Sequence, residues 1–185
     1  MSSQRQPGTG AQTTRATMDD LEQMLPESPS PESVCVKLAK ILRVHRNEVA
    51  LLRLEKNSLR FIFPPELRAA GMLPLSGSAV AARTAATRTS LLSNSFSRVK
   101  HASLFESVKL GIVEDDAAQQ MPIQRIMSVA LASPEGSILG VVQVSRKGLD
   151  PSLAGPDFTG DDLKQLEKAA LILARMGFMQ EGAEI

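Results

Sequence analysis

Few side chains of this sequence are of the kinds that perform covalent or metal chemistry. Its 185 residues include one cysteine, Cys35, and two histidines, His45 and His101. A lone thiol cannot close an intrachain disulfide, and the histidines lack the spacing of a metal pair. The serines occur without a G-x-S-x-G elbow, and there is neither a P-loop nor a G-x-G-x-x-G motif. These residues argue against an enzyme, predict no metal site and identify no cofactor.

The remaining charged groups have structural as well as chemical interpretations. The acidic pairs Asp115-Asp116 and Asp161-Asp162 lack the alternating spacing of a calcium loop, so we interpret them as a solvated loop and a helix cap. Arg125, Arg146 and Lys147 could bind an anionic ligand, but cations at strand ends also discourage edge pairing. Both interpretations of these three cations stay open.

The composition indicates a soluble cytoplasmic protein. The chain has 21 Lys and Arg against 20 Asp and Glu, and this net charge of +1 predicts binding to neither nucleic acid nor an anionic membrane. It contains no Trp or Tyr on which bases could stack. No apolar run approaches the ~20 residues that span a bilayer, and the polar N-terminus does not resemble a secretory signal.

A β-hairpin predicted over residues 122–147 is the element around which the chain is organised. Two apolar runs rich in Val, Ile and Leu, at 126–132 and 138–144, flank the turn formers at 134–136. Each run is too short for a free-standing helix, and β-branched side chains suit a half-buried sheet.

Other elements are predicted to cover the two faces of this hairpin. Ser30 and Pro31 suit a helix start, and apolar residues then recur at helical spacing to about residue 44. Strands are expected at 49–55 and 59–63, followed by an alanine-rich helix at 79–89 and a short strand at 91–92.

The C-terminal half adds a long irregular segment and a helix. We expect residues 96–121 to form the lid or wall of a pocket, because long ordered loops are commonly functional. The helix predicted over 159–179 carries two adjacent apolar stripes. The second stripe needs cover from the helix at 31–44 or from a partner subunit.

These elements divide the chain into one domain and two tails. Residues 1–30 are rich in Ser, Thr, Gln, Gly and Pro and are expected to be a flexible tail, although Met18 and Leu21 begin a short patch of helical spacing. The domain is expected over 31–180, and residues 181–185 form a C-terminal tail.

Four stretches of the sequence together resemble the GAF domain family. They are LPLSGSAVAARTAATRTSLLSN, HASLFESV, PIQRIMSVALASPEGSILGVVQVSRKG and DFTGDDLKQLEKAA. The family typically shows a Ser-Gly-rich helix start, a stretch of Leu and Asn after it, and a G-V-x-x-x-x-R/N-K strand end. Here that strand end runs from Gly140-Val141 to Arg146-Lys147. The resemblance covers about residues 32–180.

The resemblance implies an α+β fold that is GAF-like and PAS-related. Such domains have an antiparallel sheet of five or six strands, with terminal helices on one face and a lid of loops and a helix on the other. They are regulatory domains of bacterial type that often hold a small ligand beneath the lid and dimerise through the terminal helices. The two apolar stripes of the last helix fit that second feature.

The residues fit some functional classes of the family better than others. Cyclic-nucleotide-responsive members resemble an N-K…F…D-E pattern, which Lys147, Phe158 and Asp162 match, but Arg146 replaces the asparagine and Leu163 follows the aspartate. Bilin-binding members need an attachment cysteine near the pocket, whereas the single cysteine here lies in the first helix. Members that reduce free methionine sulfoxide use several cysteines, and one thiol cannot complete that disulfide cycle.

The sequence thus predicts a non-enzymatic signalling domain that senses a small molecule under a lid and transmits its binding through the terminal helices. The alternative is a ligand-free homodimeric scaffold that acts through protein–protein contacts. Either function requires a signalling partner, and neither that partner nor the ligand is identified by the sequence. The predicted ligand-binding residues are Asn94, Phe96, His101, Phe105, Arg125, Met127 and Gln143. The predicted dimer contacts are Leu38, Ile172 and Met176.

Overall fold

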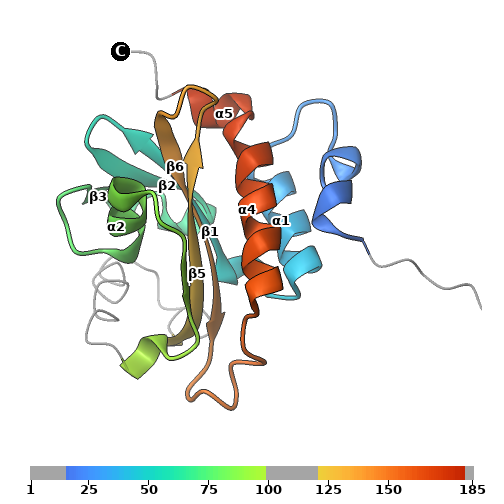
Figure 1. Ribbon diagram of the computed structural model, residues 1–185, viewed down its shortest axis with the longest axis vertical. Helices are drawn as coiled ribbons and strands as arrows, with labels where there is room; N and C mark the ends of the chain where they lie inside the picture. The colour runs from blue at the N-terminus through green and yellow to red at the C-terminus, as the bar shows by residue number, and fades with distance from the viewer. Residues whose placement is uncertain (1–15, 99–120, 182–185) are drawn as a thin grey trace, which may run out of the picture.

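The computed structural model describes residues 16–98 and 121–181, which form an α+β fold around one antiparallel sheet (Figure 1). Its six strands lie in the order β3-β2-β1-β6-β5-β4. They span Val49–Glu55 (β1), Ser58–Phe63 (β2), Met72–Pro74 (β3), Leu91–Ser93 (β4), Ile123–Ala132 (β5) and Ile138–Lys147 (β6). The predicted fold class is confirmed.

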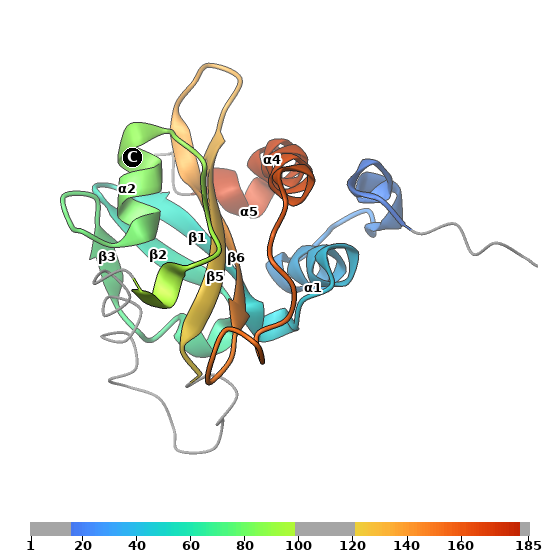
Figure 2. The same ribbon diagram turned by 60° about the horizontal axis from the view of Figure 1, so that its bottom comes forward.

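The helices lie on opposite faces of this sheet (Figures 1 and 2). On one face lie α1 (Pro31–Leu42), α4 (Gly160–Ala174) and α5 (Gly177–Gln180); we call it the helical face. On the other lies α2 (Val80–Thr87), and we call it the α2 face. Five short 3-10 helices complete the described elements: Met18–Asp20 (η1), Glu22–Met24 (η2), Arg46–Glu48 (η3), Pro65–Leu67 (η4) and Phe96–Arg98 (η5).

The predicted central hairpin is β5 and β6, which lie between β1 and β4 in the sheet. Its turn is closed by hydrogen bonds between Ser133 and Ser137, and Gly136 adopts the positive φ of 88° that the turn requires. The strands β1 and β4 continue the sheet on either side with antiparallel pairing. Side chains of the hairpin therefore alternate between the helical face and the α2 face.

Two helices begin where the sequence predicts them. The Ser30 side chain accepts a hydrogen bond from the Ser33 backbone at the start of α1, and Pro31 occupies the first helical position. At the start of α4, Thr159 and Asp162 satisfy each other's backbone N–H groups in a capping box. The sequence did not predict β3, whose three residues include Pro74 and lack β-branched side chains.

The helical face holds the larger apolar core. The inward stripes of α1 and α4 pack on sheet residues that include Leu51, Met127 and Val142, all fully buried. The α2 face is thinner, because α2 contributes the small side chains Ala81 and Ala85. Small side chains let this helix lie close to the sheet.

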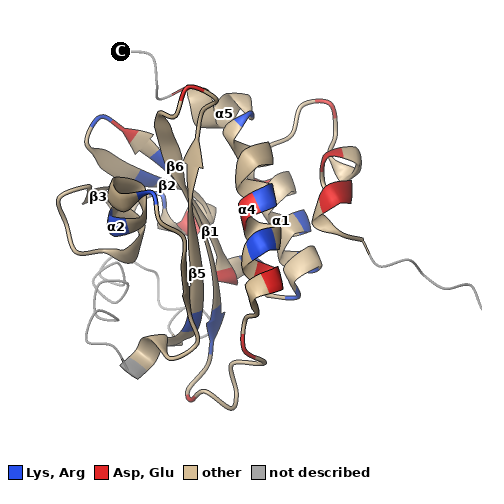
Figure 3. Cartoon of the chain, viewed as in Figure 1, with Lys and Arg blue, Asp and Glu red and all other residues tan. Residues whose placement is uncertain are grey.

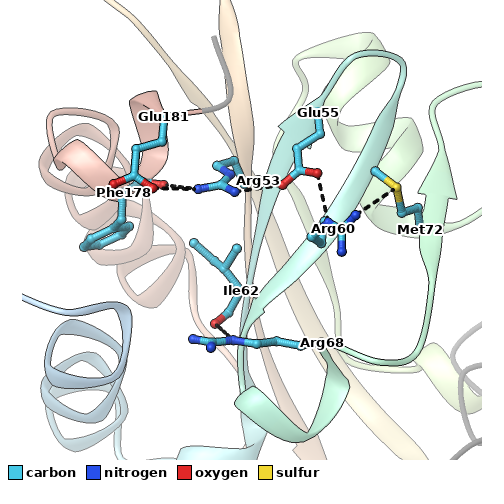
Figure 4. A network of polar contacts seen from close by, with 8 residues as sticks. All are labelled: Arg53, Glu55, Arg60, Ile62, Arg68, Met72, Phe178 and Glu181. Carbon is cyan, nitrogen blue, oxygen red and sulfur yellow. Dashed lines mark hydrogen bonds and ion pairs between the residues drawn. The ribbon is translucent and has the colours of Figure 1, made fainter. Parts of the chain in front are cut away.

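A polar network ties the β1–β2 hairpin to the end of the helical face (Figure 4). The Arg53 guanidinium donates to the Phe178 carbonyl oxygen at 2.9 Å and to the Glu55 carboxylate at 2.8 Å. Arg60 of β2 donates to the other oxygen of Glu55 at 2.9 Å. Glu55 thus joins two strands, and Arg53 joins them to α5.

The N-terminal segment differs from its prediction. Residues 16–25 do not extend away as a tail, because η1 and η2 pack on the helical layer (Figure 1). Met18 and Leu21 are both 0% exposed and belong to the core of the helical face. Composition concealed this, since two large apolar side chains suffice to anchor a short segment.

The predicted dimer contacts also lie inside the chain's own core. Leu38 of α1 is fully buried and Ile172 of α4 is 8% exposed, while Met176 packs partly buried against the same cluster. The second stripe of the C-terminal helix is therefore covered by this chain. A partner subunit could reach Leu38 or Ile172 only if the helical layer opened. None of the helices in the described ranges is long and apolar enough to cross a membrane.

Candidate functional site

The alternation of β5 and β6 places a polar row on the α2 face. Leu91 of β4, Ser128 of β5, Gln143 of β6 and Ala50 of β1 stand opposite one another across four neighbouring strands. Thr84 of α2 lies over this row, since its hydroxyl is 2.8 Å from that of Ser128. Two of these sheet positions are polar although the whole row is largely buried.

The hydrogen bonds of this row have one direction. The Thr84 hydroxyl donates to the Val80 carbonyl oxygen at 2.8 Å, so the Ser128 hydroxyl donates to Thr84. Ser128 in turn accepts from Gln143 Nε2 at 3.1 Å. The chain therefore runs Gln143 to Ser128 to Thr84 to Val80, and each donor is polarised by the next bond. We call it the Gln143–Thr84 chain.

The Gln143–Thr84 chain begins at an amide whose oxygen, Gln143 Oε1, accepts no hydrogen bond from the described atoms. Gln143 is 2% exposed, and its Oε1 has no hydrogen-bond partner among the described atoms. A buried amide oxygen without a donor costs about 1–3 kcal/mol. Native proteins satisfy almost all such groups, so an orphan on a sheet face needs an explanation. A bound molecule with an N–H or O–H group would supply the missing donor.

Apolar and polar side chains continue the α2 face beyond Gln143. Phe96 of η5 packs with Ile123 and Ile126 in a buried cluster. Gln124 accepts from the Ser97 hydroxyl at 2.6 Å and donates to the Gly148 carbonyl oxygen at 2.9 Å. This part of the face offers apolar contact on one side and satisfied amide groups on the other.

A half-open groove of about 180 Å³ lies between α2 and β4. It is lined by one stripe of α2 (Val80, Arg83, Thr84 and Thr87) and by residues 89–91. Thr84 belongs both to this groove and to the Gln143–Thr84 chain. The Ser90 hydroxyl donates a hydrogen bond to the Glu167 carboxylate of α4 at 2.8 Å, which connects the end of the groove to the helical layer.

The structure divides the predicted ligand-binding residues between the two faces. Phe96 and Gln143 lie on the α2 face. Met127 belongs to the core of the helical face, so it cannot line a pocket together with Gln143, and this part of the predicted site is corrected. Successive side chains of a strand point to opposite faces of the sheet. Met127 is next to Ser128, which pairs with Gln143, so Met127 points to the other face. His101 and Phe105 lie outside the described residues.

Asn94 and Arg125 hold the loop of residues 148–159. Asn94 donates to the Phe158 carbonyl oxygen at 3.0 Å and accepts from the Phe158 N–H at 2.8 Å. Arg125 binds Asp157 at 2.7 Å and the Pro151 carbonyl oxygen at 3.1 Å. Both side chains are engaged with this loop, so the structure gives them a positioning role.

The residues of the cyclic-nucleotide-like pattern have structural partners as well. The Arg146 guanidinium lies 4.8 Å from the centre of the Phe158 ring and donates to the Arg43 carbonyl oxygen at the end of α1. Burial lowers the pKa of Arg146, partly offset by Glu48. Burial also lowers the pKa of Lys147, whose ammonium donates to the Asn47 carbonyl oxygen at 3.0 Å.

The described residues offer no catalytic or metal-binding constellation. Cys35 is 0% exposed in α1, and burial raises the pKa of its thiol well above the usual range. A thiol of this kind is a poor nucleophile because the thiolate is the reactive form. Within residues 16–98 and 121–181, no three His, Cys, Asp or Glu side chains lie together as a metal site.

Ser128 and Thr84 were not among the residues predicted from the sequence. Both are small polar residues in apolar surroundings, and such residues are common enough in sheets and helices to attract no notice. One signal was present, because Ser128 and Gln143 each lie between large apolar neighbours in their strands, and Gln124 lies an even number of positions before Ser128. Period-two sorting of the two strands would have placed these polar side chains on one face.

No family model and no curated protein matches this sequence. Solved structures match its fold. The GAF domain from a phosphoenolpyruvate-protein phosphotransferase of Coxiella burnetii has a TM-score of 0.63 at 10% sequence identity, over 90% of this chain and 93% of that chain. A putative GAF sensor protein from Burkholderia vietnamiensis has a TM-score of 0.55 at 17% identity, over 90% and 94%.

An enzyme shares the same fold. Free methionine-R-sulfoxide reductase from Neisseria meningitidis, in complex with its substrate, has a TM-score of 0.56 at 15% identity, over 91% of this chain and 90% of that chain. The chain therefore has the GAF domain fold, as the resemblance of its sequence implies. That fold is common to sensors and to an enzyme, so the function rests on the site.

Proposed function

We propose that this GAF-fold domain is a regulatory module that senses a small molecule bound on the α2 face against Gln143. The observation that carries the proposal is the buried Oε1 of Gln143, which has no donor among the described atoms. The fold adds support, because two of its structural neighbours were solved in complex with their substrate.

The surroundings of Gln143 define the chemistry of the ligand. The polar groups of its row are an amide and two hydroxyls, without a formal charge. Ala50 and Val141 lie beside it on the same face of the sheet. We therefore expect a neutral, compact molecule with an N–H or O–H donor for Oε1 and an apolar side. His101 and Phe105 stay predicted contributors to the same site.

The hydrogen-bond chain offers a physical route from ligand to protein. A donor on Gln143 Oε1 polarises the amide and strengthens the bond to Ser128, and thereby the bond from Ser128 to Thr84 in α2. The same strands carry Met127, Val142 and Val144 on the helical face. A ligand that prefers one position of β5 and β6 would thus favour one arrangement of α1 and α4.

The thiol chemistry favours a sensor over a reductase. Reduction of a sulfoxide by thiols consumes two electrons, and an intramolecular cycle ends in a disulfide between two cysteines. This chain has one cysteine, Cys35, and it is buried in α1 on the helical face. A non-enzymatic role therefore agrees better with the residues of this chain.

A ligand screen with a matched variant tests the proposal. The wild type, Gln143→Leu and the control Gln23→Leu, whose glutamine is exposed in η2, are heated with neutral compounds that carry N–H or O–H donors, such as nucleobases, amides and polyols. A ligand at 100 times its Kd stabilises the folded state by about 2.7 kcal/mol. We expect the wild type and Gln23→Leu to melt at a higher temperature with such a compound, and Gln143→Leu to lose the shift.

Two results would count against the proposal. One is a compound that raises the melting temperature of Gln143→Leu as much as that of the wild type, because Oε1 would then play no part. The other is the absence of any shift across the compounds, together with a native mass spectrum that shows no small molecule co-purifying with the protein.

The alternative of a ligand-free dimeric scaffold finds no support at its predicted contacts. Leu38 and Ile172 are buried within the chain, so replacing either by a charged residue would unfold the helical layer rather than separate two subunits. A dimer of this protein requires a different contact.

A further inference from the structure

The segment of residues 17–25 contacts the helical layer as a docked peptide would. Met18 in the first 3-10 turn and Leu21, between the two turns, reach the core of the helical face, where both are fully buried. Each turn is only three residues long. Such short turns have little stability of their own, so side-chain contacts with the layer must hold the segment.

Charge complementarity fixes where the segment lies. Asp19 binds Lys168 of α4 at 3.0 Å, and Glu22 forms an ion pair with Arg175 just beyond the end of α4. The Met18 N–H also donates to the Gln165 side chain at 3.3 Å. Figure 3 shows the acidic positions on the N-terminal turns and the basic positions on α4. We call Gln165, Lys168 and Arg175 the α4 docking surface.

The linker that follows the segment is built to stay extended. Residues 26–31 contain three prolines, Pro26, Pro29 and Pro31, and most of the linker is exposed. Leu25, just before the linker, and Ser30, within it, both have extended backbone angles. Proline-rich linkers act as semi-rigid spacers, so this one sets the distance between the segment and the first residue of α1.

We propose that residues 17–25 exchange between two copies of this chain, so that the segment of each copy occupies the α4 docking surface of the other. A second copy offers the same apolar anchors and the same acidic groups that fit the surface within one chain, so the contacts are identical in both arrangements. Exchange then costs only the entropy of association, and swapping an identical element between two copies is a low-cost route to a dimer. The resulting dimer leaves Leu38 and Ile172 buried.

Charge reversal on the two sides separates exchange from every other mode of dimerisation. One variant carries Asp19→Lys and Glu22→Lys, and the other carries Lys168→Glu and Arg175→Glu. Each variant has like charges opposite one another within its own chain, whereas the segment of each matches the docking surface of the other. All four residues are about half exposed or more, so the substitutions should leave the core intact.

We expect each variant alone to be monomeric by light scattering, and their equimolar mixture to gain a species of twice the mass. The chain with all four substitutions restores the attraction within one chain and should behave as the wild type does. A mixture that stays monomeric while both variants retain the wild-type circular dichroism spectrum would overturn the proposal. Equal dimerisation of either variant alone would overturn it too, because the contact would then lie elsewhere.

A measurement on the wild type keeps the proposal testable if a variant fails to fold. Isotopically heavy and light chains are mixed, concentrated and treated with a carbodiimide, which joins a carboxylate to an ammonium group without a spacer. Asp19 and Lys168 are close enough for this amide bond. Exchange predicts linked peptides that combine a heavy and a light half, increasing with protein concentration. Linked peptides of uniform isotope at every concentration would show that the segment binds only its own chain.

Discussion

Replacing Gly140 by alanine should disrupt the centre of the sheet. Gly140 lies in β6 opposite Arg53 of β1 and Leu131 of β5. A Cβ added at this position would lie 2.1 Å from the Leu52 carbonyl oxygen and 2.6 Å from Met179 Cε. The methionine end can move, but the contact with the Leu52 backbone must lengthen to at least 3.0 Å.

That movement cannot be confined to one strand, because Leu52 pairs with Phe61 of β2 and with Val141 of β6. Overpacking in a core typically costs about 1–3 kcal/mol, and a clash with paired backbone belongs at or above the upper end of that range. We therefore expect Gly140→Ala to lower the free energy of unfolding by about 3 kcal/mol or more. For a chain of this size, that corresponds to a fall in Tm of roughly 6–12 °C.

Urea unfolding followed by circular dichroism measures this change, with Gly160→Ala as the matched control. Gly160 is the first residue of α4, and a Cβ there would meet nothing within 4 Å. Alanine at such a position reduces the entropy of the unfolded chain and should stabilise the protein by about 0.4–1 kcal/mol. If the free energy of unfolding of Gly140→Ala lies within about 0.5 kcal/mol of that of the wild type, the close approach of β1 and β6 is wrong, and with it the position of Gln143.

Two further predictions concern polar groups of the sheet. Thr84→Val and Ser128→Ala should each destabilise the protein by about 1–2 kcal/mol, because each removes the hydrogen bond between the two buried hydroxyls. The double variant should be destabilised by about 1 kcal/mol less than the sum of the single variants, because that bond is lost only once. Strict additivity in a urea double-mutant cycle would refute the hydrogen bond between them. Hydrogen bonds from Arg53 and Arg60 hold the pKa of Glu55 below its usual 4.5, so its stabilisation is complete above that pH and is lost as the pH falls through the lower folded pKa. The advantage of the wild type over Glu55→Gln should therefore shrink as the pH falls below 4.5. A constant difference in urea midpoints across that fall would contradict this linkage.

The sequence predicted the elements whose signals are local. Ser30 and Pro31 begin α1 through a side-chain cap and a fixed φ, and these act within one turn of helix. The central hairpin followed from two β-branched runs and Gly136. Cap chemistry and turn chemistry depend on neighbouring residues alone, so one sequence suffices to find them.

The parts that the sequence did not predict depend on contacts between distant residues. Met18 is buried only because its segment meets α4, about 150 residues further along the chain, where its N–H binds Gln165. The role of Asn94 follows from Phe158, which lies 64 positions away. Met127 looked equivalent to Gln143 because nothing local says which face of a strand meets which helix. Burial, partner and face are properties of the assembled sheet.

The two proposals for this protein meet at the hairpin of β5 and β6. On the α2 face the hairpin carries Ser128 and Gln143, and on the helical face it carries Val129 and Val144 beneath α1 and α4. The α4 docking surface lies on the outer side of that same helical layer. A ligand that repositions the hairpin would therefore alter the position of α4. It would thereby alter the affinity of Lys168 and Arg175 for residues 17–25, whether these come from the same chain or from a second copy. Linkage requires the reverse as well, so charge reversal at Lys168 and Arg175 should change ligand affinity at Gln143 if the two sites are coupled. Equal ligand affinity in that variant and the wild type would show that sensing and segment exchange are independent.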